Sequence, residues 1–438
     1  MNPEAAPVRP VPLLQQRPFR VLNYTRFSSR VAQNAINFAL VLLIVEETGK
    51  AFLSSLLVLA LVVPATAAGI VAGTAADVLP KRLLVSLGDL VRAGICLYFL
   101  RNQGGVASYY VVAVLLATAT QFASSAEGAI LPSIVARHEL ARANAIAQGV
   151  GGAAQLVGLA VLTPVVLRLF DSPRALFAIC AGLFTLAAVQ VWWIGRTSSS
   201  HRQEIGGDVP GSWWLTGWRA MRADPRVMHA AIELTLLSTA IIILSGLIPA
   251  YISEILDLPV DIGAVILMPG AIGVVLGLRV AGFLAHRVPH AFLSSVGFFS
   301  FVVLLALLAF VNTEADFLGG YAYFSWLNDV QIGNFDGGGV MAMVLMLPLG
   351  FSYSVVNVAG QTVMDDRVPI HLRGRVGATQ AAMAALASSL PVLAAGALSD
   401  VIGVPPVMAL VAGVTGAIAF MNLRQPKETG LSGRGTPA

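Results

Sequence analysis

Charged residues are scarce in this sequence. Asp, Glu, Lys and Arg make up 11% of the 438 residues, whereas hydrophobic residues make up 57%. A soluble globular domain carries about a quarter charged residues. The shortage therefore excludes a soluble domain and indicates an integral membrane protein. The net charge of only +4 reflects the loops of such a protein, and we expect no nucleic-acid partner.

Several catalytic and nucleotide-binding motifs are also missing. There is no Walker A sequence, since the pair Gly49-Lys50 is followed by alanine, and this excludes a primary pump. There is no GxSxG, and His138-Glu139 lacks the second histidine of a zinc-protease helix. The two cysteines, Cys96 and Cys180, lie inside apolar segments, where we expect them to pack. We therefore expect no enzyme activity, no cofactor and no metal.

Long apolar segments run along the whole chain. An α-helix needs about 20 residues to cross a bilayer, so these segments predict transmembrane helices. We count twelve: 19–45, 51–76, 83–100, 108–134, 143–169, 175–195, 226–254, 262–285, 291–311, 339–364, 375–398 and 404–423. The predicted organisation is a tail (1–18), a six-helix bundle (19–195), a linker with an interfacial helix (196–225), a second bundle (226–423) and a tail (424–438).

The cations of the loops predict the orientation. Most Lys and Arg of the loops lie on the side of the two termini, and the loops of the opposite side carry only Lys50, Arg101, Arg168 and Arg174. Cytoplasmic loops are enriched in Lys and Arg. We therefore expect both termini in the cytoplasm and the chain in the inner membrane of a prokaryote, as a monomer. The long loop 312–338 mixes aromatic and acidic residues, and a lid on the outer surface is one hypothesis for it.

The two halves repeat each other. "GTAADVLPK" at 73–81 is matched by "GFLAHRVPH" at 282–290, and "VARHELARAN" from Val135 resembles "VPIHLRGRV" from Val368. Six helices, a linker and six helices in the same orientation form a parallel repeat. In transporters built this way the substrate binds near the midplane between the halves.

These stretches resemble the major facilitator superfamily. Its loop GxxxDRxGRR appears here with Val78 and Pro80 in place of an arginine and a glycine. "RFSSRVAQNAINFAL", "GDLVRA", "LPSIVARHELARANAI" and "RVPIHLRGRVGA" are similar to the branch of siderophore exporters and transmembrane secretion effectors. The glycine-rich motif of exporters in helix 5 is reduced at its end to Thr163 and Pro164. The resemblance implies the all-α major facilitator fold and a cytoplasmic latch formed by Gly73, Asp77, Lys81, Arg82, Asp89, Arg92, Arg373 and Arg375.

Ionisable residues within the membrane are costly and therefore candidates for function. They are Arg26, Arg30, Asp89, Arg92, Glu127, Glu233 and Arg279. Asp89 and Arg92 are three residues apart on one helix, which predicts a structural ion pair. Glu127 and Glu233 have no opposite charge within a turn, so we expect one of them to carry a proton. The alternative is a static salt bridge to Arg30 or another cation.

Polar residues recur at helical spacing in three of the predicted helices. They are Arg30, Gln33, Asn34 and Asn37; Thr118, Gln121 and Ser125; and Ser354, Asn357 and Gln361. Such stripes line either a water-filled cavity or a helix contact, and we expect the cavity. The pairs Gly69/Gly73 and Gly273/Gly277 have the GxxxG spacing that permits close helix contact.

The sequence thus favours a secondary transporter that works by alternating access. We expect proton-coupled export, as an antiporter, of an amphipathic small molecule, because apolar side chains flank the polar stripes. The alternative is an uncoupled facilitator or flippase for a lysolipid-like substrate. A receptor or scaffold without transport activity is the alternative from another class.

Overall fold

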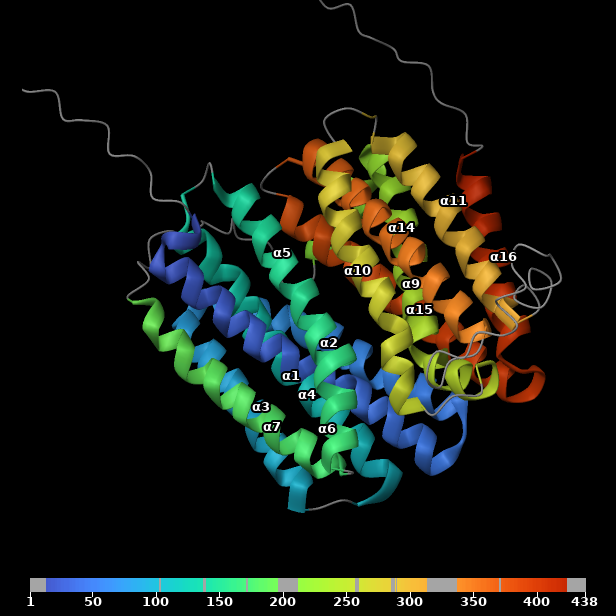
Figure 1. Ribbon diagram of the computed structural model, residues 1–438. Helices are drawn as coiled ribbons and strands as arrows, with labels where there is room; N and C mark the ends of the chain where they lie inside the picture. The colour runs from blue at the N-terminus through green and yellow to red at the C-terminus, as the bar shows by residue number, and fades with distance from the viewer. Residues whose placement is uncertain are drawn as a thin grey trace, which may run out of the picture.

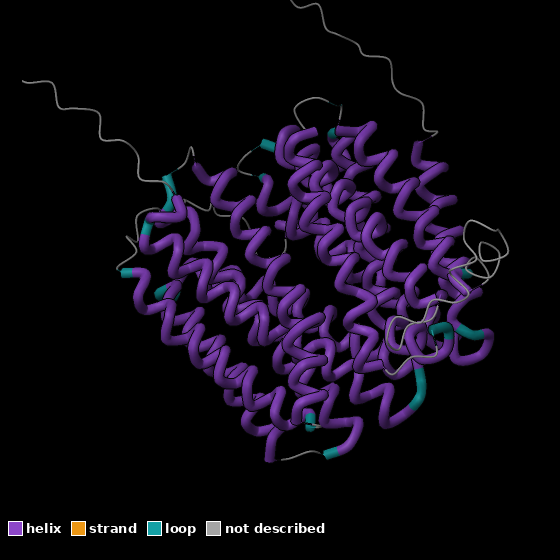
Figure 2. The backbone as a smooth tube through the Cα atoms, viewed as in Figure 1, coloured by secondary structure: helices purple, strands orange, loops and turns teal. Residues whose placement is uncertain are grey.

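The structure is a bundle of long helices. The computed structural model describes residues 13–101, 104–136, 139–170, 172–195, 212–256, 260–284, 288, 290–312, 337–369 and 372–423. Within these ranges every regular element is helical (Figure 2). A bilayer offers no hydrogen-bond partner to the backbone, and an α-helix satisfies its own amide and carbonyl groups.

The chain contains two sets of six membrane-crossing segments (Figure 1). The first set is α1 (Arg17–Thr48), α2 (Ala51–Val78), α3 (Lys81–Arg101), α4 (Gly105–Ile134), the run of α5 (Leu140–Leu156), η3 (Val157–Leu162) and α6 (Thr163–Phe170), and α7 (Pro173–Gln190). The second set is α9 (Pro225–Glu254), α10 (Val260–Leu284), α11 (His290–Ala309), α14 (Gly337–Arg367), α15 (Arg373–Ile402) and α16 (Val404–Leu423).

The predicted number of spans is confirmed. Eleven of the described helices are long and apolar enough to cross a membrane, and α10 adds a shorter apolar segment, Val265–Ala281. Several helices extend beyond the predicted segments, because polar residues at their ends continue the helical hydrogen bonds; α1, for example, begins at Arg17 and ends at Thr48. Most of the loop suggested as a lid, 313–336, lies outside the described residues.

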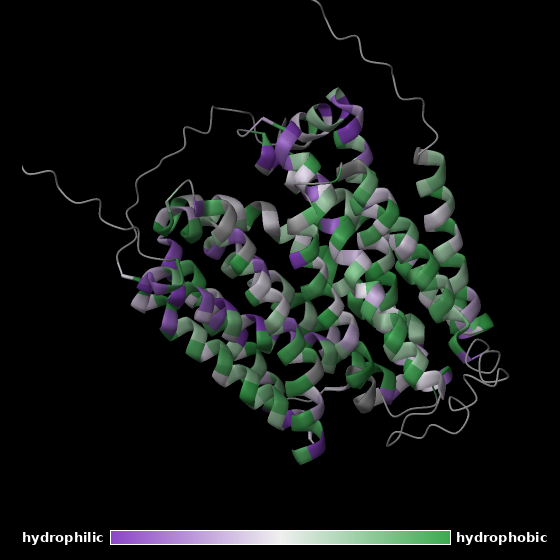
Figure 3. Ribbon diagram, turned by 45° about the horizontal axis from the view of Figure 1, so that its top comes forward, coloured by the Kyte–Doolittle hydropathy of each residue, from purple (hydrophilic) through white to green (hydrophobic). Residues whose placement is uncertain are grey.

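Each half has its own hydrophobic core. In the first half Phe99, Phe177 and Phe184 are completely buried, and the rings of Phe99 and Phe177 lie 4.4 Å apart between centroids. In the second half Phe301 and Val407 are equally buried. Hydrophobic residues dominate the helices of both halves, and hydrophilic residues gather at several helix ends (Figure 3). This is the distribution that a hydrocarbon environment favours.

The end of the predicted linker forms a helix, α8 (Ser212–Ala223), as expected. It packs against α15 and α9, with Met221 completely buried. Asp224 then caps α9: its carboxylate accepts the backbone N–H of Arg226 at 2.9 Å and the guanidinium of Arg367 at 3.0 Å. Backbone N–H groups at a helix start have no partner within the helix, so this contact ties the linker to the second half.

The two GxxxG pairs behave differently. On α10, a Cβ atom at Gly273 would collide with the carbonyl of Leu347, and one at Gly277 would lie 2.7 Å from the carbonyl of Phe351. These glycines therefore let α10 and α14 touch backbone to backbone. The expectation is wrong for the other pair: no atom of the described residues lies within 4 Å of a Cβ at Gly73, and the nearest of them to Gly69 is Gln121 Oε1 at 4.0 Å.

We predict that Gly273→Ala lowers the stability of the protein, because the added methyl group forces α10 and α14 apart. Overpacking of this kind costs about 1–3 kcal/mol. Thermal or chemical unfolding in detergent measures the loss. The matched control is Gly413→Ala in α16, where no atom of the described residues lies within 4 Å of the new Cβ. Equal stability of the two variants would contradict the prediction.

Candidate functional site

A buried ion pair lies between α1, α3 and α7 of the first half. The guanidinium of Arg92 bonds the carboxylate of Asp89 and donates to Ser29 Oγ at 2.9 Å, and Ser29 Oγ donates to Asp89 Oδ1 at 3.1 Å. Arg92 also lies 4.5 Å from the ring centroid of Phe184, which adds a cation–π contact. Asp89 is 0% and Arg92 3% exposed, so the pair predicted from the spacing is confirmed inside the bundle.

Hydrogen bonds extend this pair to the polar stripe of α1. Arg92 Nη1 lies 3.5 Å from Gln33 Oε1, and Gln33 Nε2 donates to Asn37 Oδ1 at 2.7 Å. From α4, Thr120 Oγ1 donates to Gln33 Oε1 at 2.7 Å. Gln33, Asn37 and Thr120 are half-buried. The network therefore runs from the closed interior of the bundle to groups with partial access to its surface.

Glu127 of α4 has a cation beside it. Arg26 Nε lies 3.5 Å from Glu127 Oε2, and Arg26 Nη2 donates to the backbone carbonyl of Glu127 at 3.0 Å. Of the two alternatives for Glu127, the structure contains the salt bridge, and its partner is Arg26 of α1. Arg30, one turn further along α1, is exposed. The attraction of Arg26 offsets part of the cost of burying the carboxylate.

Glu233 of α9 has a different environment. It is 6% exposed and accepts a short hydrogen bond from the hydroxyl of Ser294 on α11. Its side chain thus points into the second bundle. Within the described part of the chain, Glu233 has no ion pair. Glu127 and Glu233 are therefore not equivalent: among the described residues, Glu127 has a cation beside it and Glu233 has a hydroxyl.

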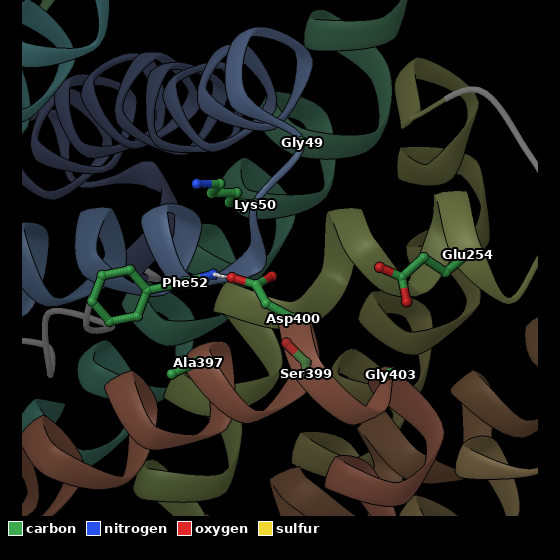
Figure 4. A pocket seen from close by; sticks show the side chains of 8 residues that line it. All are labelled: Gly49, Lys50, Phe52, Glu254, Ala397, Ser399, Asp400 and Gly403. Atoms are coloured by element: carbon green, nitrogen blue, oxygen red, sulfur yellow. Dashed lines mark hydrogen bonds between the residues drawn. The ribbon is translucent and has the colours of Figure 1, made fainter.

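The two halves meet through α2. The carboxylate of Asp400 at the end of α15 accepts the backbone N–H of Ala51 at 2.8 Å and that of Phe52 at 3.2 Å, at the start of α2. Asp400 also lines a cavity of ≈ 670 Å³ together with Lys50 and Glu254 (Figure 4). Nothing in the sequence pointed to Asp400, because it follows an apolar segment and resembles an ordinary loop residue.

Comparison with known proteins decides the family. The sequence pattern of the Major Facilitator Superfamily matches residues 24–391. The chain belongs to this superfamily. As a major facilitator protein it is a membrane transporter and not an enzyme, and its twelve-helix fold is the fold of that superfamily, as the sequence predicted.

Relatives of this facilitator include an efflux protein. The multidrug efflux pump Tap of Mycobacterium tuberculosis is 25% identical over 375 residues, which cover 82% of both chains, and Tap of Mycobacterium bovis is equally similar. Two solved structures share the fold. The nucleoside transporter NupG has a TM-score of 0.68 at 13% identity, covering 93% of this chain and 98% of that one. A bacterial homologue of the human lysosomal transporter Spinster, inward-facing and unoccupied, has a TM-score of 0.66 at 16% identity, covering 93% and 96%.

The residues of the predicted cavity stripes lie in different surroundings in this facilitator. The stripes of α1 and α4 lie in neighbouring helices of the first half. Asn34 donates to the backbone carbonyl of Arg30 at 2.8 Å, and Thr118 donates to the backbone carbonyl of Val114 at 2.8 Å. Gln121 and Ser125 are half-buried. On α14 of the second half, Gln361 is exposed and Asn357 is half-buried. Ser354 is 1% exposed and packs against Gly277 of α10, so it lies in a helix contact.

The proposed latch residues bond within their own halves wherever their contacts are described. Lys81 donates to the carbonyl of Ala129 at 3.0 Å, and Arg373 donates to that of Val368 at 3.2 Å. Arg82 and Arg375 are half-buried, and Asp89 and Arg92 lie inside the first bundle. The side chain of Asp77 lies outside the described residues, as do His286 and Pro289 of the second copy.

Sequence reasoning missed Ser29 and Thr120, since a single hydroxyl in an apolar helix gives no distinct signal.

We predict that Arg92→Met strongly destabilises the facilitator, because it leaves the carboxylate of Asp89 buried without its cation. Breaking a buried pair from one side costs about 3–5 kcal/mol. The double variant Asp89→Asn/Arg92→Met removes both charges and should recover most of this loss. Unfolding curves of the three proteins in the same detergent test this. A double variant no more stable than Arg92→Met would contradict the pairing.

Proposed function

We propose that this major facilitator protein is a secondary active transporter that exports an amphipathic small molecule by alternating access, coupled to protons. The direction is supported by its similarity to Tap, which is described as a multidrug efflux pump. The distribution of loop cations supports an inner-membrane protein with both termini in the cytoplasm. With that orientation, Ala51 and Asp400 lie on the outer side.

Alternating access is supported by the way the halves meet. Most buried apolar residues of each half pack within that half, although Ala51 of α2 joins the core of the second half, so each half can move largely as a unit about this contact. The contact of α2 with α15 and α9 is the largest between the halves, and its hydrogen bonds lie at the end that carries Asp400. A pair of bundles joined at one end can pivot there and admit a solute from the other. This contact is the observation that carries the proposal.

An amphipathic substrate is supported by the surface of the first half. Gln33, Asn37 and Thr120 supply a small group of polar contacts, and the rest of α1 and α4 is mainly apolar. Ligand sites with a few placed polar groups in an apolar surround orient molecules that have one polar part. A sugar, which needs polar contacts on every side, fits this surface poorly.

Proton coupling is supported by Glu233. A carboxyl group that takes up and releases a proton in a membrane must be stable in its protonated, neutral form. A neighbouring hydroxyl can hydrogen-bond the neutral form, whereas a neighbouring cation stabilises the ionised form. Ser294 is such a neighbour for Glu233, whereas Glu127 lies beside the cation of Arg26. We assign the coupling proton to Glu233, and Glu127 stays the second candidate.

We predict that Glu233→Gln abolishes the dependence of export on a pH gradient, because an amide cannot exchange a proton. Purified protein in liposomes, loaded with a fluorescent amphipathic dye and placed in an imposed pH gradient, measures this directly. Glu127→Gln should lower the rate by disturbing the contact with Arg26 while keeping the gradient dependence. Glu139→Gln at the start of α5 is the matched control and should behave as the wild type.

Three outcomes separate the alternatives. Gradient dependence that survives in both Glu233→Gln and Glu127→Gln would reject coupling through these carboxylates. Dye flux in the wild type that ignores the gradient would support the uncoupled facilitator or flippase. A wild-type protein that moves none of a panel of dyes and lysolipids would reject the proposed substrate classes.

A further inference from the structure

Asp400 supplies a helix cap that α2 lacks. The residue before α2 is Lys50, whose side chain makes no capping hydrogen bond. The first N–H groups of a helix have no partner within it and carry a partial positive charge, so a carboxylate is their best acceptor. That carboxylate comes from the other half of the molecule, with its two oxygens on two successive N–H groups.

The helices below this cap are in very close contact. Ser55 of α2 is completely buried between Gly246 of α9 and Gly396 of α15. A Cβ atom at these glycines would lie 2.8 Å and 2.5 Å from Ser55 Oγ, closer than packing allows. The absence of a side chain at both positions brings the start of α2 within reach of Asp400. The close packing therefore places the carboxylate of Asp400 within hydrogen-bond distance of the start of α2.

We propose that Asp400 is a positioning residue for transport that holds the outer gate shut. While the transporter is open on the cytoplasmic side, the carboxylate of Asp400 accepts the N–H groups of Ala51 and Phe52 and holds the start of α2 against the end of α15. This contact, called the clasp below, breaks when the outer side opens. The inference rests on the alternating access proposed above. It adds the residue that sets the balance between the two states.

The surroundings of the clasp fit a reversible contact. Asp400 is exposed on the rim of the outer cavity, where water can replace the two N–H groups when α2 moves away. Among the described residues, the other charged side chains on this rim are Lys50 of the first half and Glu254 of α9. Glu254 accepts the backbone N–H of Val404, a partner in its own half, and so provides a carboxylate of the same cavity outside the clasp.

The test measures the distance between the outer ends of the halves in the full chain. Spin labels at Leu169→Cys and Val401→Cys, both strongly exposed, report this distance after the buried Cys96 and Cys180 have been changed to alanine. We expect Asp400→Ala to raise the ratio of long to short distances about tenfold, the size expected for a lost charged hydrogen bond. Asp400→Asn, which keeps one acceptor oxygen and no charge, should be intermediate, and Asp400→Glu should restore part of the short distance.

Two controls make the result decisive. Glu254→Gln removes a carboxylate from the same cavity and should leave the distances of the wild type. Gly396→Ala inserts a methyl group against Ser55 and should open the same end by a steric route. If Gly396→Ala lengthens the distance and Asp400→Ala does not, the labels detect opening of this end, and the proposed role of Asp400 is wrong. If Asp400→Ala lowers the melting temperature without changing the distances, Asp400 has only a structural role and the proposal is overturned.

The outcome separates this inference from the proposed function. The distances are measured without substrate or gradient, so a failure of dye export does not affect them. If the wild type exports dye normally in a pH gradient and the distances in Asp400→Ala are unchanged, the clasp is rejected and the proposed export function stands. If the outer ends move apart in both Asp400→Ala and Gly396→Ala but the wild type exports none of the dyes, the role of Asp400 in the outer gate stands and the proposed export is rejected.

Discussion

Hydrocarbon offers no hydrogen bonds, and this constraint governs the whole structure. Every polar group that enters the membrane must find a partner within the protein or stay at a surface that water reaches. The backbone meets the constraint by forming helices. Three buried carboxylates meet it with a neighbouring group, Asp89 with Arg92, Glu127 with Arg26 and Glu233 with Ser294, whereas Arg30 and Arg279 are exposed. The scarcity of charge in the sequence and these pairings are two results of the same physical cause.

Both halves contain a hydroxyl–carboxylate contact between their first and third spans, with the two groups exchanged between the spans. In the first half a hydroxyl of the first span, Ser29, bonds an acid of the third span, Asp89. In the second half the acid lies on the first span, as Glu233, and the hydroxyl on the third, as Ser294. Arg92 joins the first of these pairs, and within the described residues no cation joins the second. The first contact is thus charge-compensated by Arg92, and the second joins a carboxylate to a hydroxyl.

Much of the fold was predictable, because composition and segment length report directly on the bilayer. The ion pair of Asp89 and Arg92 was also predictable, since both residues lie on one helix at a fixed spacing. Contacts between helices were not. The same GxxxG spacing gives close contact at Gly273 and open space at Gly73. The partner of Glu127 and the burial of Ser354 depend on how each helix is rotated about its axis, which spacing within one helix cannot specify.

The start of α2 has a thermodynamic consequence of its own. Because its cap is borrowed from α15, the first turn of this helix is well bonded only while the halves touch. In the outward-open arrangement proposed above, the amides of Ala51 and Phe52 would pass to water, and the turn would become a site of local fraying. Amide hydrogen exchange at these two backbone positions would then follow the working cycle of the entire molecule.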